Sequence, residues 1–99
     1  EAAMPDMKTI QPVIKVKIIG GQVFIDWGWG GNGAFLDMLQ IQVDRGQGWT
    51  DLAYDTTPGY TDTHALPPTI TTWKYRAIYR VGDGQAGIWS AEVGIAVGG

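Results

Sequence analysis

The amino-acid sequence predicts an all-β domain, a sandwich of seven antiparallel strands, on three observations. First, residues 73–81 alternate between bulky apolar and mostly charged residues, as in a half-buried strand. Second, turn signals containing Gly, Pro or Asp recur roughly every 8–12 residues. Third, 15 glycines and an aromatic content of 11% suit short strands and disfavour helices. In the central strand we expect one set of residues inward and the other outward: Trp73, Tyr75, Ala77, Tyr79 and Val81 inward; Lys74, Arg76, Ile78 and Arg80 outward.

Size and composition limit the possible functions. The 99 residues suffice for one domain with a core that needs neither metal nor disulfide. Cysteine is absent, so thiol chemistry is excluded. Ten acidic against seven basic residues give a net charge of −3, which argues against nucleic acid as a partner. No apolar run is long enough to span a bilayer, so we expect no membrane insertion.

The predicted domain organisation has three segments. Residues 1–11 lack a pattern and are expected to be a linker or a loosely ordered leading segment. Residues 12–97 form the sandwich, and residues 98–99 form an exit linker. The chain shows no signal peptide and starts at Glu1, so we expect it to come from a longer polypeptide.

The first two strands, at residues 13–19 and 22–27, form a predicted hairpin. Gly20-Gly21 supplies the positive φ angles that the favoured two-residue turn requires. Lys15 and Lys17 face water by alternation, which leaves their neighbours Ile14, Val16 and Ile18 on the buried side. Counting outward from the turn predicts four pairs: Ile19 with Gln22, Ile18 with Val23, Val16 with Ile25, and Ile14 with Trp27. Alternation within the second strand gives the same register.

Five further strands complete the count. They are predicted at residues 36–44, 49–53, 60–65, 73–81 and 89–97. Turns separate them at residues 28–33, 44–48, 57–59 and 82–87, and Pro67-Pro68 ends the strand at 60–65. Alternation places Leu39, Ile41, Val43, Val93, Ile95 and Val97 inward, and Met38, Gln40 and Gln42 outward.

Several of these segments resemble a known family. The runs Tyr60-Thr61-Asp62-Thr63, Leu66-Pro67, Trp73-Lys74-Tyr75-Arg76-Ala77 and Gly87-Ile88-Trp89-Ser90-Ala91-Glu92-Val93 resemble the second half of a fibronectin type III domain of bacterial type. Trp27 resembles the family's core tryptophan on the second strand. The resemblance covers about Val13 to Val97 and implies an immunoglobulin-like sandwich.

The sequence departs from the family pattern at two points. The family usually places a tyrosine at the start of the sixth strand, where its hydroxyl bonds back to the corner, and Trp73 stands there instead. Either the Trp73 indole N–H makes an equivalent bond or Tyr75 takes the role. The run Arg80-Val81-Gly82-Asp83 is not the Arg-Gly-Asp tripeptide of some members, so no integrin binding is implied.

No constellation of residues predicts catalysis. His64 and Ser90 are the only histidine and serine, and they lie far apart in the sequence, with His64 inside a predicted strand. The aspartates at 44, 51, 55, 62 and 83 are scattered, and we expect them to cap turns and strand ends. The glycine-rich loop at 28–33 lacks the Lys-Ser/Thr of a phosphate cradle. We therefore predict no enzyme activity, no cofactor and no metal.

Candidate binding residues lie at one end of the predicted sandwich. Trp29 and Phe35 are in or beside the loop at 28–33, and the resemblance implies that this loop shares an end with the turn at 82–87, which contains Asp83. One interpretation is that these aromatic side chains stack on a sugar ring or anchor a protein partner. The other is that they cap the open end of the core. Trp49 and Tyr54 are expected to cover the sheet edge at the opposite end. Trp89 could stack on one of the outward cations of the central strand, but we interpret this face as solvated.

The sequence therefore predicts a non-catalytic interaction module, a spacer or docking domain within a larger extracellular or cell-surface bacterial protein. Its partners would be neighbouring domains. One alternative is a carbohydrate-binding or adhesive module that uses the loop aromatics on a glycan or protein ligand. Another is a subunit of a surface appendage that self-associates edge to edge. Lys15 and Lys17 on the outward face of the first strand partly protect its edge against such pairing.

Overall fold

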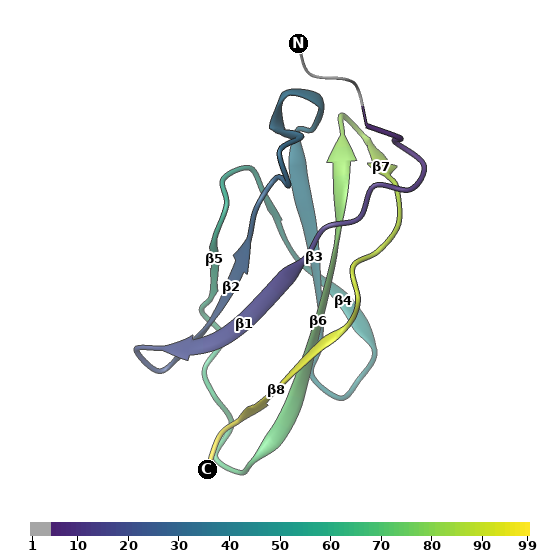
Figure 1. Ribbon diagram of the computed structural model, residues 1–99. Helices are drawn as coiled ribbons and strands as arrows, with labels where there is room; N and C mark the ends of the chain where they lie inside the picture. The colour runs from purple at the N-terminus through teal and green to yellow at the C-terminus, as the bar shows by residue number, and fades with distance from the viewer. Residues whose placement is uncertain (1–4) are drawn as a thin grey trace.

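The computed structural model describes residues 5–99 and consists of strands with one short 3-10 helix (Figure 1). Residues 1–4, the beginning of the predicted leading segment, lie outside the described residues. The elements are β1 (Ile14–Ile19), β2 (Gln22–Trp27), η1 (Gly33–Phe35), β3 (Met38–Asp44), β4 (Trp49–Asp55), β5 (Tyr60–Asp62), β6 (Thr71–Val81), β7 (Gly84–Ala86) and β8 (Val93–Val97).

The strands form two antiparallel sheets, which confirms the predicted all-β class and the two-layer arrangement of a β-sandwich. One sheet has the order β1-β2-β5, and the other has the order β4-β3-β6-β7, with β8 also paired to β6. The two sheets share one hydrophobic core.

Residues 5–99 form eight strands, so the predicted count of seven is wrong. Residues 84–86, predicted as turn, pair with β6 as β7, whereas the predicted strand at 89–97 begins only at Val93. Between β7 and β8 the chain leaves the ladder and returns to it at Ser90. The Ser90 N–H donates to the Ala77 carbonyl at 2.7 Å, and the Ser90 hydroxyl accepts the Ala77 N–H at 2.9 Å. A side chain therefore replaces the backbone acceptor that a continuous strand would offer.

The predicted register of the first hairpin is confirmed in all four pairs. Gly20 and Gly21 have φ angles of 59° and 77°, which a side chain would strain. The predicted burial is right for Ile14 but wrong for Ile18, which is 44% exposed. Register determines the face on which a side chain lies, but burial also requires an opposing layer, and the hairpin tip projects beyond the rest of the sandwich (Figure 1).

Alternation along β6 correctly predicts the aromatic core. Trp73, Tyr75 and Tyr79 are almost completely buried between the sheets. Val81 was predicted inward and is 43% exposed, because it lies at the end of β6, next to the turn. Ile78 points outward but is buried, and so is Gln40, its partner on β3. The outer face of this sheet is therefore covered by its own long side chains.

Several strand ends differ from the prediction. β3 begins at residue 38 and not 36, β4 extends to 55 and not 53, β5 ends at 62 and not 65, and β6 begins at 71 and not 73. His64 consequently lies outside a strand, in a bend that begins where the Asp62 carboxylate accepts the His64 N–H at 3.1 Å. This local bond ends β5 early, because a side-chain acceptor competes with the ladder.

The described chain enters and leaves the domain at opposite poles (Figure 1). The molecule is elongated, with extents of 50 × 25 × 19 Å. Residues 6–10 lie at the pole that carries the β6–β7 turn, and the C-terminal Gly99 lies at the other pole. The long axis therefore separates the two ends of the described chain.

Candidate functional site

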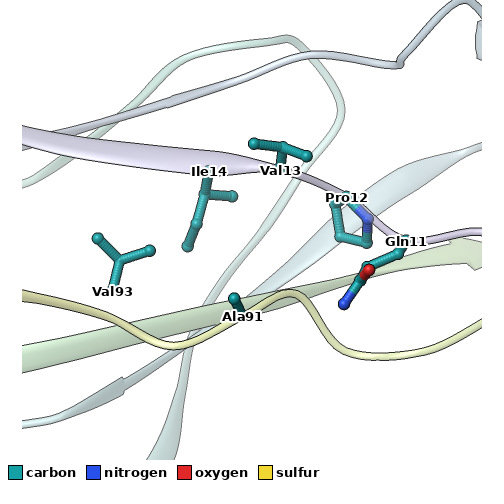
Figure 2. A pocket seen from close by; sticks show the side chains of 6 residues that line it. All are labelled: Gln11, Pro12, Val13, Ile14, Ala91 and Val93. Carbon is teal, nitrogen blue, oxygen red and sulfur yellow. The ribbon is translucent and has the colours of Figure 1, made fainter.

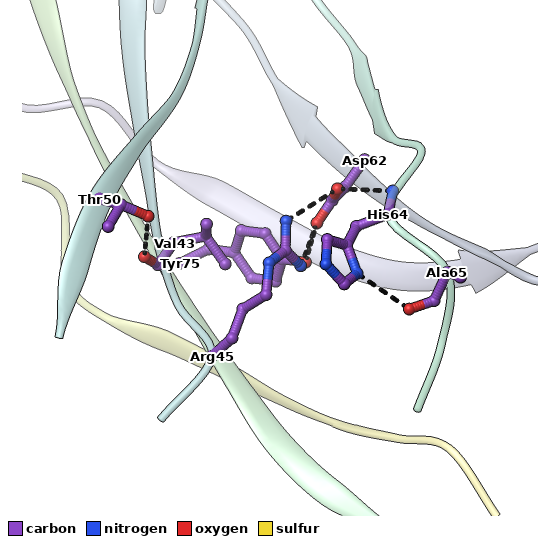
Figure 3. Close-up of polar contacts among 7 residues, drawn as sticks. All are labelled: Val43, Arg45, Thr50, Asp62, His64, Ala65 and Tyr75. Carbon is purple, nitrogen blue, oxygen red and sulfur yellow. Dashed lines mark hydrogen bonds and ion pairs between the residues drawn. The ribbon is translucent and has the colours of Figure 1, made fainter. Parts of the chain in front are cut away.

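A buried carboxylate joins the two sheets near the Gly99 pole (Figure 3). Asp62, at the end of β5, is 1% exposed. Its two oxygens accept hydrogen bonds from Arg45 Nη1 at 2.9 Å and Arg45 Nη2 at 3.1 Å, a bidentate ion pair. The Tyr75 hydroxyl, from β6 in the other sheet, donates to the same carboxylate at 2.6 Å. We call Arg45, Asp62 and Tyr75 the inter-sheet clasp.

The electrostatics of the clasp favour a charged Asp62. Burial raises the pKa of its carboxyl, but the hydrogen bonds from Arg45, Tyr75 and the His64 N–H outweigh burial and hold the pKa below its ordinary value. Burial and the adjacent carboxylate raise the pKa of the Tyr75 hydroxyl, so it stays protonated and donates. The clasp is thus a satisfied structural network in which neither the acid nor the phenol is poised to exchange a proton near neutral pH.

The clasp also shows which of the two aromatic residues considered for a bond back to the corner, Trp73 or Tyr75, makes such a bond. The Tyr75 hydroxyl makes the bond, and its acceptor is the Asp62 side chain. Trp73 instead packs under the Arg45 guanidinium, whose central carbon lies 4.3 Å from the ring centroid. The His64 ring meets Trp73 edge-on at 5.4 Å.

The predicted loop residues lie at the opposite pole, where Trp29 covers the end of the core. Trp29 packs edge-on against Trp27 at 4.7 Å and stacks on Tyr79 at 6.1 Å. The buried Tyr79 hydroxyl donates to the Gly28 carbonyl at 2.6 Å and so fixes the base of the loop. Trp29 is half-buried. These contacts match the alternative in which Trp29 caps the open end of the core.

Phe35 and Asp83 lie near this pole but do not join Trp29 in one cluster. Phe35 ends η1 and is half-buried, and within the described part of the chain no aromatic stacking links it to Trp29. Asp83 is exposed in the β6–β7 turn, where its backbone carbonyl accepts Arg80 Nη2 at 2.5 Å. Asp37, which follows η1, accepts the Gly82 N–H through its carboxylate at 2.5 Å. The segment after the glycine-rich loop and the β6–β7 turn therefore do share one end of the molecule.

The outer face of the larger sheet carries a stacked ladder that the sequence predicted only in part. The Arg76 guanidinium lies between two indoles, 4.5 Å from the ring centroid of Trp89 and 4.4 Å from that of Trp49. The contact with Trp89 is the stacking that the sequence left open, so the interpretation of this face as merely solvated is wrong at Arg76. Trp49 was expected to cover an edge, and its stacking on Arg76 was missed.

A hydrogen-bonded network continues this ladder across β3 and β4. Arg76 Nε donates to Gln42 at 2.9 Å, and Arg80 Nη1 donates to Gln40 at 2.9 Å. Both glutamine amides then donate to Asp51, at 2.8 Å and 2.9 Å. The amide hydrogen bonds lower the pKa of Asp51 and keep it charged. Arg76 and Arg80 are thus engaged by neighbours on their own sheet.

None of these groups forms a reactive constellation in the described structure. The Ser90 hydroxyl bonds to the backbone of residues 77 and 91, and the His64 ring bonds to the Ala65 carbonyl. Between residues 5 and 99, no three acidic or histidine side chains gather where they could hold a metal ion. Of the scattered aspartates, Asp44 does cap a turn, accepting the N–H groups of Gly46 and Gly48.

The chain was also compared with known proteins. No protein-family model matches it, and no curated protein matches it significantly. In the portion that the structure describes, no helix is long and apolar enough to cross a membrane.

Proposed function

We propose that this chain is a non-catalytic, fibronectin type III-like module that acts as a spacer or docking domain within a larger extracellular or cell-surface protein. The observation that carries the proposal is the pole-to-pole course of the chain along an axis of 50 Å. A module that receives the chain at one pole and releases it at the other holds whatever is attached at a set separation.

The strand order supports the fibronectin type III-like assignment. The sheet β1-β2-β5 faces a sheet in which β3 and β4 extend from one side of β6. β7 and β8 share the other side of β6 and are interrupted only at residues 87–92. Counted as one broken strand, they give the seven-stranded topology that the resemblance implies.

The chemistry of the side chains supports a non-catalytic role. The gap between the sheets is filled by Trp73, Tyr75 and Tyr79. Asp62, the one fully buried acid among residues 5–99, is neutralised by Arg45 and held by Tyr75. Active sites need polar groups with unused bonding capacity beside a cavity. Within the described residues the buried side-chain polar atoms bond to other protein groups, with Arg80 Nε the one exception, which favours a role carried by the outer surfaces.

A replacement experiment in the longer polypeptide tests the proposal. Residues 5–97 are deleted in one variant and exchanged for an unrelated β-sandwich of similar length in another, and the native activity of the polypeptide is measured. For a spacer, deletion lowers the activity and exchange restores it. For a docking domain, exchange fails but point changes on an outer face reproduce the loss. Full activity after deletion would contradict both roles.

A further inference from the structure

We propose that the open edge of β1 binds an extended acidic segment of another protein, which adds to the smaller sheet as a fourth strand. The inference goes beyond the spacer role, because it names a surface and the chemistry of its partner. It depends on four features of β1: its free backbone groups, its alternating side chains, the groove beside it and its charge.

The first feature is the unpaired edge. β1 is the outer strand of β1-β2-β5 and pairs only with β2 among the described strands. In a hairpin with a two-residue turn, Ile19 and Gln22 are a hydrogen-bonded pair, and such pairs alternate along the ladder. The N–H and C=O groups of Val16 and Ile18 therefore point away from β2. An incoming strand would find donors and acceptors in strand geometry.

The second feature is the pattern of side chains on β1 and the residue before it. On the outer face, Lys15 and Lys17 lie between two exposed apolar residues, Val13 at 73% and Ile19 at 51%. On the inner face, exposure increases from the buried Ile14 to Ile18 at the hairpin tip. Apolar groups left exposed on a free edge are the groups that a partner strand would cover.

The third feature is a groove at the start of β1. A hollow of about 110 Å³ lies between β1 and the segment that leads into β8, and it is lined mostly by apolar groups: Gln11, Pro12, Val13, Ile14, Ala91 and Val93. Ile14 points from β1 into the gap, and Val93 points toward it from the facing segment (Figure 2). A second hollow on the other side of Val13 is lined by Lys15 and Asp26. The inner side chains of an added strand would enter the first hollow.

The fourth feature, charge, selects the occupant. A second copy of this chain pairing β1 against β1 would bring its own Lys15 and Lys17 close to the same two lysines, and like charges on adjacent strands repel. A strand with carboxylates at alternate positions would instead meet both lysines. On β2 the acid Asp26 lies opposite Lys15, whereas Phe24 lies opposite Lys17. The partner strand therefore has acidic residues on its outer face and apolar residues on its inner face.

The test uses a synthetic peptide in which Val and Glu alternate, with a peptide of alternating Val and Lys as the control. We expect the acidic peptide to bind, to slow amide hydrogen exchange at Val16 and Ile18, and to bind more weakly as salt rises. Replacing both edge lysines by glutamine (Lys15→Gln, Lys17→Gln) should weaken binding by about tenfold. The matched pair Lys8→Gln and Lys74→Gln changes the net charge equally and should leave binding unchanged.

A backbone variant separates strand addition from simple charge attraction. Val16→Pro removes an N–H that points to the open edge and leaves the bonds to β2 in place, so binding should be lost while the spectrum stays that of the folded domain. Ile18→Pro serves if the first variant does not fold. Three results would overturn the proposal: equal binding of the basic peptide, unchanged binding by the proline variant, or protection of the same amides by dimerisation without peptide. None of them bears on the spacer role, which the replacement experiment tests separately.

Discussion

The hydroxyl of Tyr75 donates a 2.6 Å hydrogen bond to the carboxylate of Asp62 and thereby joins β6 of one sheet to β5 of the other. Arg45 binds both carboxylate oxygens from the β3–β4 turn. Three segments that are distant in sequence therefore meet at one buried charge. Because a buried charge that loses a partner is costly, removing any member of the clasp should lower the free energy of unfolding of the domain.

The first prediction concerns the hydroxyl of the clasp. Tyr75→Phe keeps the ring in the core but removes one donor from the buried carboxylate. The free energy of unfolding, measured by urea denaturation, should fall by about 1–3 kcal/mol. Tyr54→Phe is the control, because that hydroxyl makes an exposed 3.3 Å bond to Asp51 and its loss should cost less than about 0.5 kcal/mol. Equal decreases in the free energy of unfolding of the two variants would show that the Tyr75 hydrogen bond stabilises the domain no more than an exposed one does.

The second prediction concerns pH. The pKa of Asp62 in the folded domain lies below its ordinary value of 3.8. Its contribution to stability is therefore complete above that pH and disappears as pH falls through the lower, folded-state pKa. Asp62→Asn should be less stable than the wild type at neutral pH and should lose less stability on acidification below pH 3.8. Arg45 is partly exposed, so the neutral-pH loss should be smaller than the roughly 3–5 kcal/mol typical of a fully buried broken pair.

Unfolding curves of both proteins between neutral and acidic pH check this prediction. Asp44 and Asp51 also have lowered pKa values, so the variant keeps some acid sensitivity. Only the difference between the two proteins reports on Asp62. Parallel stability curves through the acid range would contradict the charged clasp.

The clasp could be predicted from the sequence only in part. Alternation from Tyr60 places Asp62 on the inner face of β5, so an inward carboxylate was predictable, but no local pattern names Arg45, 17 residues earlier, as its partner. By contrast, the first hairpin was predictable in full, because a two-residue turn fixes every pair by counting. Burial of Ile18 was not, because it depends on where the opposite sheet ends.

The surface ladder was likewise predictable only in part. Alternation put Arg76 on the outer face and left stacking by Trp89 open, and the structure shows that stacking. Trp49 pairs with Asp44 across the turn at residues 45–48. A turn of four residues does not fix the register by counting as a two-residue turn does. The position of Trp49 against Arg76 therefore had to come from the structure.

The third prediction concerns this ladder. Arg76→Gln removes a cation that lies over two indoles, and each such contact contributes about 0.5–1 kcal/mol at an exposed site. The free energy of unfolding should fall by about 1–2 kcal/mol, and tryptophan fluorescence should change because Trp49 and Trp89 both lose a neighbour. Lys74→Gln is the matched control on the same strand and face, with no ring above it. Equal free energies of unfolding in the two variants would show that the ladder does not stabilise the fold.

The fourth prediction concerns the segment before β1. Gly87 has a φ of 80°, and a Cβ there would collide with the Ile10 carbonyl oxygen, which accepts the Ile88 N–H at 2.9 Å. Gly87→Ala should lower the free energy of unfolding by more than about 1 kcal/mol. It should also speed amide exchange at Ile88. Gly84→Ala is the control, since its nearest neighbour atom would be 3.9 Å away. Unaltered exchange at Ile88 would mean that this segment is not held by the bond.

The spacer role is tested most directly by a distance across the module within the intact longer polypeptide. The chain contains no cysteine, so Lys8→Cys, in the segment of residues 6–10 at one pole, and Ile70→Cys, which lies beside Gly99 at the other, place spin labels at two exposed sites. Pulsed dipolar spectroscopy then measures the distribution of distances between the labels. The account predicts a single narrow distribution at a long separation, in keeping with the 50 Å axis. A broad or short distribution would show that the module does not hold its poles apart and would contradict the proposed function.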